Sequence, residues 1–206
     1  SPLSFGGFGA MLRHLPRISG GLHSALRDSS DLLLSRKYLS MINPYQPALS
    51  VTWLFQRSMC VRVDQKISDA QLINRTLSTT FQGMKRMGDP VLKPFLQDVV
   101  QAGGLTKAMF AMTLADPALV LSVMRAVGPA SIFEWFFHYL ALVSYSVLCR
   151  VVAITNVRTF EAELPQVHST STPESADDNS ALKYTTLAVL DRWRYGSGRD
   201  VLEHSK

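Results

Sequence analysis

The longest helix that the sequence predicts runs from about Ala130 to Leu164, between the helix-breaking pair Gly128-Pro129 and Pro165, and its middle is strongly apolar. From Tyr139 to Cys149 no residue is charged, and between Glu134 and Tyr139 only His138 can carry a charge. An uncharged helical run of about 15 residues spans roughly 22 Å, which is shorter than the roughly 30 Å hydrocarbon core of a bilayer. The segment therefore predicts a long helix that is buried in a helix bundle or lies partly in a membrane interface, and a spanning helix is the less favoured interpretation.

Most of the remaining chain shows the three- and four-residue spacing of apolar residues that is typical of helices. We expect helices at about residues 67–84, 91–101, 105–115, 117–127, 130–164 and 181–193. Gly103-Gly104 is expected to close the second of these, and Asp116-Pro117 is typical of an N-cap followed by proline at the first helical position. No β-hairpin signal and no internal repeat is present, so the sequence predicts an all-α protein with four main helices plus short ones.

Composition divides the chain into a basic N-terminal arm, residues 1–47, and a helical bundle, residues 48–206. The arm is rich in Gly, Ser and Arg, its first acidic residue is Asp28, and one helix is possible near residues 24–38. We expect the rest of the arm to be extended and to order only on a partner. Within the bundle, residues 166–181 are expected to form a polar loop.

The formal net charge is +5, while 47% of the residues are hydrophobic. A basic, apolar protein favours anionic partners such as phospholipid head groups, nucleic acid or an acidic protein surface. The composition of the arm fits a mitochondrial chain whose presequence has been removed, and a basic flexible arm would look the same. The two cysteines, Cys60 and Cys149, form no metal or disulfide pattern, so we expect buried free thiols in a reducing compartment.

Four short stretches occur in an order that resembles one known family. They are Leu54-Phe55-Gln56-Arg57 with Arg62, Gly103-Gly104 with Lys107-Ala108, Arg150-Val151-Val152, and Arg192 with Arg199-Asp200-Val201. Together these stretches resemble the alternative oxidases, which are mitochondrial di-iron carboxylate ubiquinol oxidases. The resemblance covers about residues 49–201. It implies a membrane-associated, ferritin-like four-helix bundle on one leaflet of the mitochondrial inner membrane.

The resemblance also indicates where the iron ligands of that family, four carboxylates and two histidines, would fall in this chain. The corresponding positions are Ile67, Asp116, Leu119, Asn156 or its neighbours, Tyr195 and Gly198. Only Asp116 carries a carboxylate, helix capping explains it more simply, and no Glu-x-x-His occurs anywhere in the sequence. One carboxylate cannot hold two iron ions, so the resemblance implies the fold without metal, cofactor or oxidase activity.

Two further groups of side chains bear on function. Glu134 and His138 lie one helical turn apart, and a local polar pair is a simpler interpretation than a proton relay or half a metal site. An aromatic cluster fits an ordinary core or a membrane-interface belt. Its candidates for contact with lipid or quinone are Trp135, Phe136, Tyr139 and Tyr145.

Near the C-terminus, three arginines alternate with aromatic residues. They are Arg192, Arg194 and Arg199, with Trp193 and Tyr195. Such a patch is superficially typical of nucleic-acid binding, but no recognised motif accompanies it. Nucleic acid is therefore the less favoured partner.

Together, these features predict a non-catalytic accessory subunit of a mitochondrial inner-membrane complex of the respiratory chain, with a structural or assembly role. Its expected partners are other subunits of that complex and membrane lipid. Two alternatives stay open. One is a quinone- or lipid-binding membrane protein that keeps an apolar cavity without the metal. The other is a basic subunit of a mitochondrial ribonucleoprotein particle.

Overall fold

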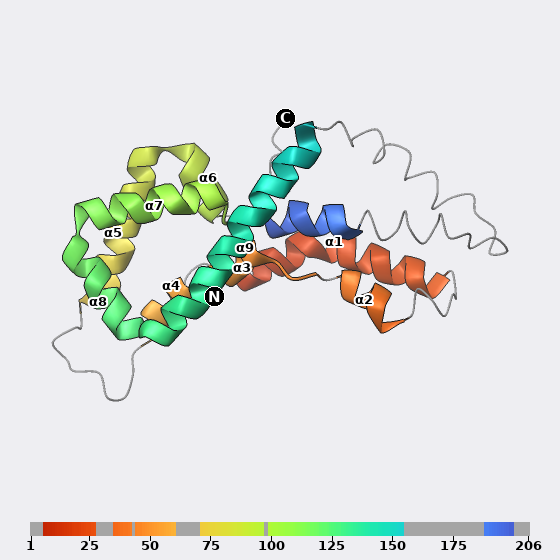
Figure 1. The fold of residues 1–206 in the computed structure, drawn as a ribbon, viewed down its shortest axis with the longest axis horizontal. Coiled ribbons are helices and arrows are strands. Elements are labelled where there is room, and N and C mark those ends of the chain that lie inside the picture. The colour runs from red at the N-terminus through yellow and green to blue at the C-terminus, as the bar shows by residue number, and fades with distance from the viewer. Residues whose placement is uncertain are drawn as a thin grey trace.

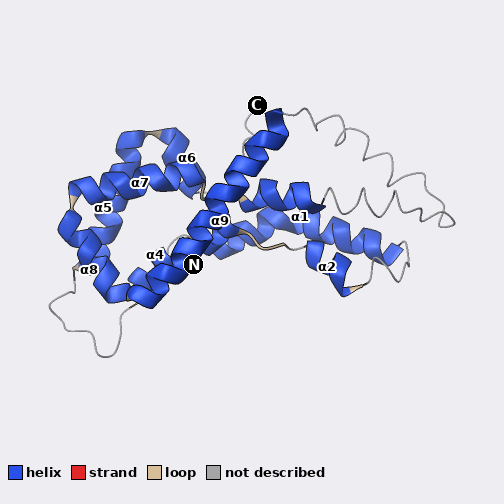
Figure 2. Cartoon of the chain, in the orientation of Figure 1, coloured by secondary structure: helices blue, strands red, loops and turns tan. Residues whose placement is uncertain are grey.

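A computed structural model describes residues 6–27, 35–42, 44–60, 71–96, 99–154 and 188–199, and every regular element in these ranges is an α-helix (Figures 1 and 2). The helices are α1 (Gly6–Arg27), α2 (Arg36–Ile42), α3 (Pro47–Ser50), α4 (Thr52–Ser58), α5 (Leu72–Met87), α6 (Asp89–Leu96), α7 (Ala102–Ala115), α8 (Pro117–Val127) and α9 (Pro129–Ile154). Residues 188–196 are also helical. The predicted all-α class is confirmed.

Helices α5 to α8 form one group, and α9 runs from it across the molecule (Figure 1). Helix α5 packs against α6, α7 and α8, and α7 also packs against α8. The contact face of α5 consists of Leu72, Thr76, Thr80 and Met84, which are all buried and lie four residues apart. This spacing places the four side chains on one side of the helix.

A second cluster of buried side chains joins α9 to α3, to the start of α4 and to the segment before α7. It consists of Ala48, Val51, Val100, Trp135 and Leu142. The indole Nε1 of Trp135, on α9, donates a hydrogen bond of 2.9 Å to the carbonyl oxygen of Val51. This bond satisfies the only polar atom of the indole and fixes α9 against the start of α4.

Proline and glycine set several of the breaks between helices. Asp116 caps α8 and is followed by proline at the first helical position, as predicted. Gly128 separates α8 from α9 with φ +89°, in a backbone region that favours glycine. The expected stop at Gly103-Gly104 is wrong, because α7 already begins at Ala102. Glycines in a first turn cost less than in a helix interior, since the N–H groups there have no intrahelical partner.

The expectation of an extended arm is wrong for Gly6–Arg27, which forms the 22-residue helix α1. The glycines and Pro16 favoured the extended interpretation. However, Met11, Leu15 and Leu22 recur at helical spacing along one side. This helical spacing is the signal that the glycines and Pro16 obscured.

Two other expectations are only partly testable or need correction. Helix α9 begins as predicted but is described only to Ile154, and the polar loop at 166–181 lies outside the described residues.

Both cysteines are free, but Cys60 is exposed and Cys149 is partly exposed. The prediction of buried thiols is therefore wrong, since neither side chain points into the core.

Candidate functional site

A cavity among the described helices has a volume of about 880 Å³ and is partly open to solvent. This volume lies within the range of about 300–1,000 Å³ that is typical of small-molecule sites. Most of its wall is apolar. The larger side chains of the wall are Met11, Ile18, Leu49, Leu54, Phe55, Leu77, Phe81, Met84, Phe95, Leu96, Leu105, Met109, Met112 and Trp135.

Two polar side chains in the wall of this cavity are buried and incompletely paired. His14, on α1, is 3% exposed, and Gln46, just before α3, is 8% exposed. No hydrogen-bond partner in the described part of the chain reaches Nδ1 of His14 or Oε1 of Gln46. An unpaired buried polar atom is costly, so both atoms mark places where a further partner would be stabilising.

The cavity end at His14 lies in a positive environment. Arg13 Nη2 is 3.1 Å from Nε2 of His14, and Arg17 donates a hydrogen bond to the carbonyl oxygen of Ile42. Burial, together with the charges of Arg13 and Arg17, lowers the pKa of the His14 imidazole to about 4. His14 is therefore neutral near pH 7.

Residues 195–198 form a tight junction beside α1 rather than a ligand position. The guanidinium of Arg17 lies 4.7 Å from the ring centroid of Tyr195. The side-chain amide of Gln101 donates a hydrogen bond of 3.0 Å to the carbonyl of Gly198, whose φ is +67°. Ser197 is fully buried. The space at Gly198 is already filled, because an added Cβ would lie 2.9 Å from the carbonyl oxygen of Val100.

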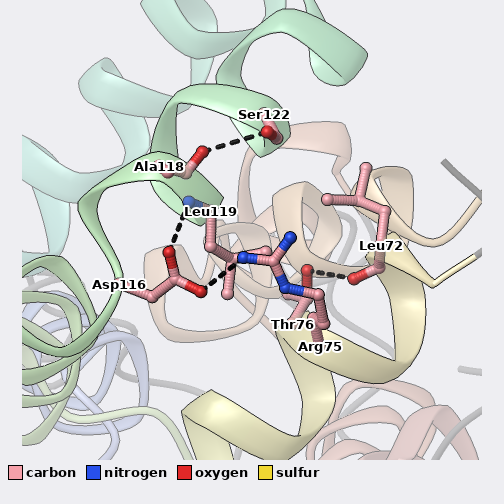
Figure 3. A network of polar contacts seen from close by, with 7 residues as sticks. All are labelled: Leu72, Arg75, Thr76, Asp116, Ala118, Leu119 and Ser122. Carbon is pink, nitrogen blue, oxygen red and sulfur yellow. Dashed lines mark hydrogen bonds and ion pairs between the residues drawn. The ribbon is translucent and has the colours of Figure 1, made fainter. Parts of the chain in front are cut away.

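The carboxylate of Asp116 has two structural partners (Figure 3). Its Oδ1 accepts a hydrogen bond of 2.9 Å from the backbone N–H of Leu119, and its Oδ2 lies 2.6 Å from Nη2 of Arg75. The hydrogen bond from Arg75 is the largest cause of the lowered pKa of Asp116. These contacts agree with the capping interpretation.

The other predicted ligand positions that the structure describes bring no metal-binding side chain to Asp116. Leu119 is a fully buried core residue, and Tyr195 and Gly198 belong to the junction beside α1. Ile67 and Asn156 lie outside the described residues. Among the residues that are described, no group of three or more His, Cys, Asp or Glu side chains could hold a metal ion.

The predicted aromatic cluster does not act as one surface. Trp135 is buried, lines the cavity and stacks on Tyr139 with ring centroids 5.4 Å apart. Phe136 is exposed. The hydroxyl of Tyr145 accepts a hydrogen bond of 2.6 Å from Nε of Arg192, at the C-terminal segment. Of the four candidates for contact with lipid or quinone, only Trp135 faces the cavity.

Glu134 and His138 do not form the expected local polar pair, because the imidazole of His138 contacts Tyr45 instead. The hydroxyl of Tyr45 lies 2.5 Å from Nδ1 of His138, and the two rings are tilted with centroids 5.7 Å apart. His138 thus connects α9 to the segment before α3. This contact joins two elements at the surface of the molecule, which is a structural role.

Large apolar side chains cover the outer sides of α7, α8 and α9. The most exposed of them are Phe110, Leu114, Leu121, Phe133, Phe137, Val147 and Val151. By length and composition α9 could cross a membrane between Pro129 and Val152, and only 11% of its most apolar window is buried. Helices α7 and α8 pass the same test only as a pair, which is bent by 113°.

Comparisons of the chain with protein-family models, curated protein sequences and solved structures gave no match. The proposed function therefore rests on the geometry of the described residues.

The sequence pattern does not single out His14 or Gln46, because their common cavity depends on α1 being helical. The apolar spacing along α1 is the signal that could have revealed it.

Proposed function

We propose that this chain is a non-catalytic, all-helical accessory subunit of a membrane protein complex. The observation that carries the proposal is the exposed apolar face of α9. Phe133, Phe137, Leu140, Val147 and Val151 lie at steps of three, four and seven residues and are all exposed, so they share one side of the helix. Soluble monomers rarely expose a contiguous apolar patch of this extent.

Helix α1 supports the proposal from the other end of the molecule. Met11, Leu15, Leu22 and Leu26 lie along one side and are each at least 43% exposed, whereas His14, on a neighbouring side, is buried. This arrangement is the reverse of that in a surface helix of a soluble protein, which buries its apolar stripe. Lipid or a neighbouring subunit would cover such a stripe.

The resemblance to the alternative oxidases gives the proposal its location, the mitochondrial inner membrane, and its arrangement, a ferritin-like four-helix bundle. The candidate bundle helices are α5, α7 with α8, α9 and the segment at residues 188–196. The sharp bend between α7 and α8 departs from the single second helix that the resemblance implies. Contact with respiratory-chain subunits and membrane lipid is part of the same proposal.

The absence of catalysis is proposed on the chemistry of the ligand positions. Asp116 is already paired with Arg75 and Leu119, and no Glu-x-x-His is present in the sequence. We expect no stoichiometric iron after reconstitution of the purified chain with ferrous salt, as measured by elemental analysis. Two iron ions per chain would contradict the proposal.

Co-purification from the cells that make the protein tests the partner. We expect the tagged full chain to be recovered from detergent-solubilised membranes together with other subunits. The double variant Phe133→Ser with Phe137→Ser should lower that recovery about tenfold, because it breaks the apolar face. A matched pair of substitutions on the exposed side of α5, Gln82→Ser with Lys85→Ser, should leave that recovery unchanged. Recovery as a single soluble chain contradicts the proposal, and recovery with ribosomal RNA favours the ribonucleoprotein alternative.

A further inference from the structure

The cavity lined by His14 and Gln46 has the properties of a binding site for an amphiphile. Its wall is mostly apolar, and its volume of about 880 Å³ suits a single long-chain molecule. Both polar side chains are more than nine-tenths buried, and each presents one unpaired atom. An apolar cavity with a few unpaired polar atoms favours a ligand that has a polar end and a long apolar body.

The protonation of His14 defines what the polar end must provide. The guanidinium of Arg13 can only donate hydrogen bonds, and its Nη2 is 3.1 Å from Nε2 of His14. In the neutral ring Nε2 is therefore the acceptor, which leaves the proton on Nδ1. The Nδ1–H of His14 is then an unused donor and Oε1 of Gln46 is an unused acceptor, on two residues that line the same cavity.

A carboxyl group matches both atoms. Its carbonyl oxygen can accept from the Nδ1–H of His14, and its hydroxyl can donate to Oε1 of Gln46. The second bond requires the protonated, neutral form of the acid, which burial in an apolar cavity favours. The alkyl chain would lie against the aromatic side chains of Phe81 and Phe95, which line the same cavity.

We propose that the cavity binds one long-chain fatty acid, with its carboxyl group at His14 and Gln46 and its alkyl chain among the apolar side chains of α5 to α7. This site is separate from the exposed face of α9, so it does not depend on the proposed accessory role. The ligand would occupy the interior of the chain rather than cover its outer surface.

Binding of palmitic acid to the purified, delipidated full chain tests the proposal, with displacement of a fluorescent fatty acid as the measurement. We expect one molecule per chain. His14→Leu and Gln46→Leu should each weaken binding about tenfold, roughly the loss of one buried hydrogen bond. His23→Leu is the matched control, because His23 lies on the same helix but is exposed and lines no part of the cavity.

A second series separates the polar contact from simple partition into apolar surface. Methyl palmitate cannot donate a hydrogen bond to Gln46, so it should bind about tenfold more weakly than palmitic acid and should be insensitive to Gln46→Leu. Ala108→Trp fills the cavity and should abolish binding of both compounds, with folding checked by circular dichroism. Equal binding of acid and ester, unchanged by the His14, Gln46 and Ala108 substitutions, would overturn the proposal.

Discussion

Asp116 combines a helix cap with an ion pair, and the two roles can be separated experimentally. Asp116→Ala removes the acceptor for the Leu119 N–H and the partner of Arg75. We expect a loss of about 1 kcal/mol for the cap and at most about 1 kcal/mol for the exposed ion pair. Asp116→Asn keeps the helix cap, so it should lose only the contribution of the ion pair to the free energy of unfolding. Chemical denaturation in one detergent measures both, and equal losses would contradict the capping role.

His14 should make stability depend on pH. Its pKa is about 4 in the folded chain, compared with about 6.5 for an unperturbed histidine. Between these values the unfolded chain binds a proton that the folded chain does not, so the free energy of unfolding should fall as the pH is lowered from about 6.5 to about 4. Above this interval His14 should contribute no pH dependence.

The variant His14→Gln supplies the comparison. It removes the titrating group while it keeps a polar side chain, so its unfolding free energy should change less than that of the parent chain between about pH 7 and pH 5. Identical pH profiles for the two chains would show that His14 is solvated in the folded protein.

At the level of single residues, the sequence predicted local chemistry better than distant contacts. The capping role of Asp116 follows from Pro117 and the apolar run after it, all within a few residues. The position of Tyr195 beside Arg17 depends on packing between residues about 180 positions apart, and that of Gly198 beside Gln101 on residues 97 positions apart, which no local pattern encodes. The cavity atoms of His14 and Gln46 could not be predicted for the same reason.

At the level of elements, the packing of residues 188–196 against α9 depends on the absence of a side chain at Gly196. An added Cβ would lie 2.4 Å from Cδ2 of Tyr145 and 3.1 Å from Cδ of Pro47. Gly196→Ala should therefore destabilise the chain by about 1–3 kcal/mol through overpacking. Gly20→Ala is the control, since a Cβ there meets nothing within 4 Å, and it should be neutral or stabilise α1 by up to about 1 kcal/mol. Denaturant unfolding measures both, and a Gly196→Ala chain as stable as the parent would contradict this packing.

The helices themselves were predicted in proportion to the regularity of their apolar spacing. The starts of α8 and α9 follow from Asp116-Pro117 and Gly128-Pro129, where proline and glycine limit the backbone. Helix α1 was missed because its many glycines argue against a helix, although its apolar stripe argues for one. Propensity is a weak guide where an amphipathic face can be covered by packing or by a partner.

At the level of the whole molecule, the chain alone leaves many large apolar side chains exposed to solvent. The exposed sides of α1, α7, α8 and α9 contain most of the large exposed hydrophobic side chains of the described residues. The net charge of +5 would add attraction to anionic lipid head groups, at about 1 kcal/mol for each well-placed Lys or Arg. The account therefore makes lipid or other subunits part of the stable state.

The most direct test is the behaviour of the isolated full chain with and without detergent, measured by size-exclusion chromatography with light scattering and by thermal unfolding. We predict aggregation or loss of the chain from solution without detergent, and a monodisperse helical species in mild detergent, because the apolar sides of α1 and α9 require cover. A monodisperse, soluble monomer that unfolds cooperatively without detergent would contradict the accessory-subunit account and would favour a free-standing binding protein.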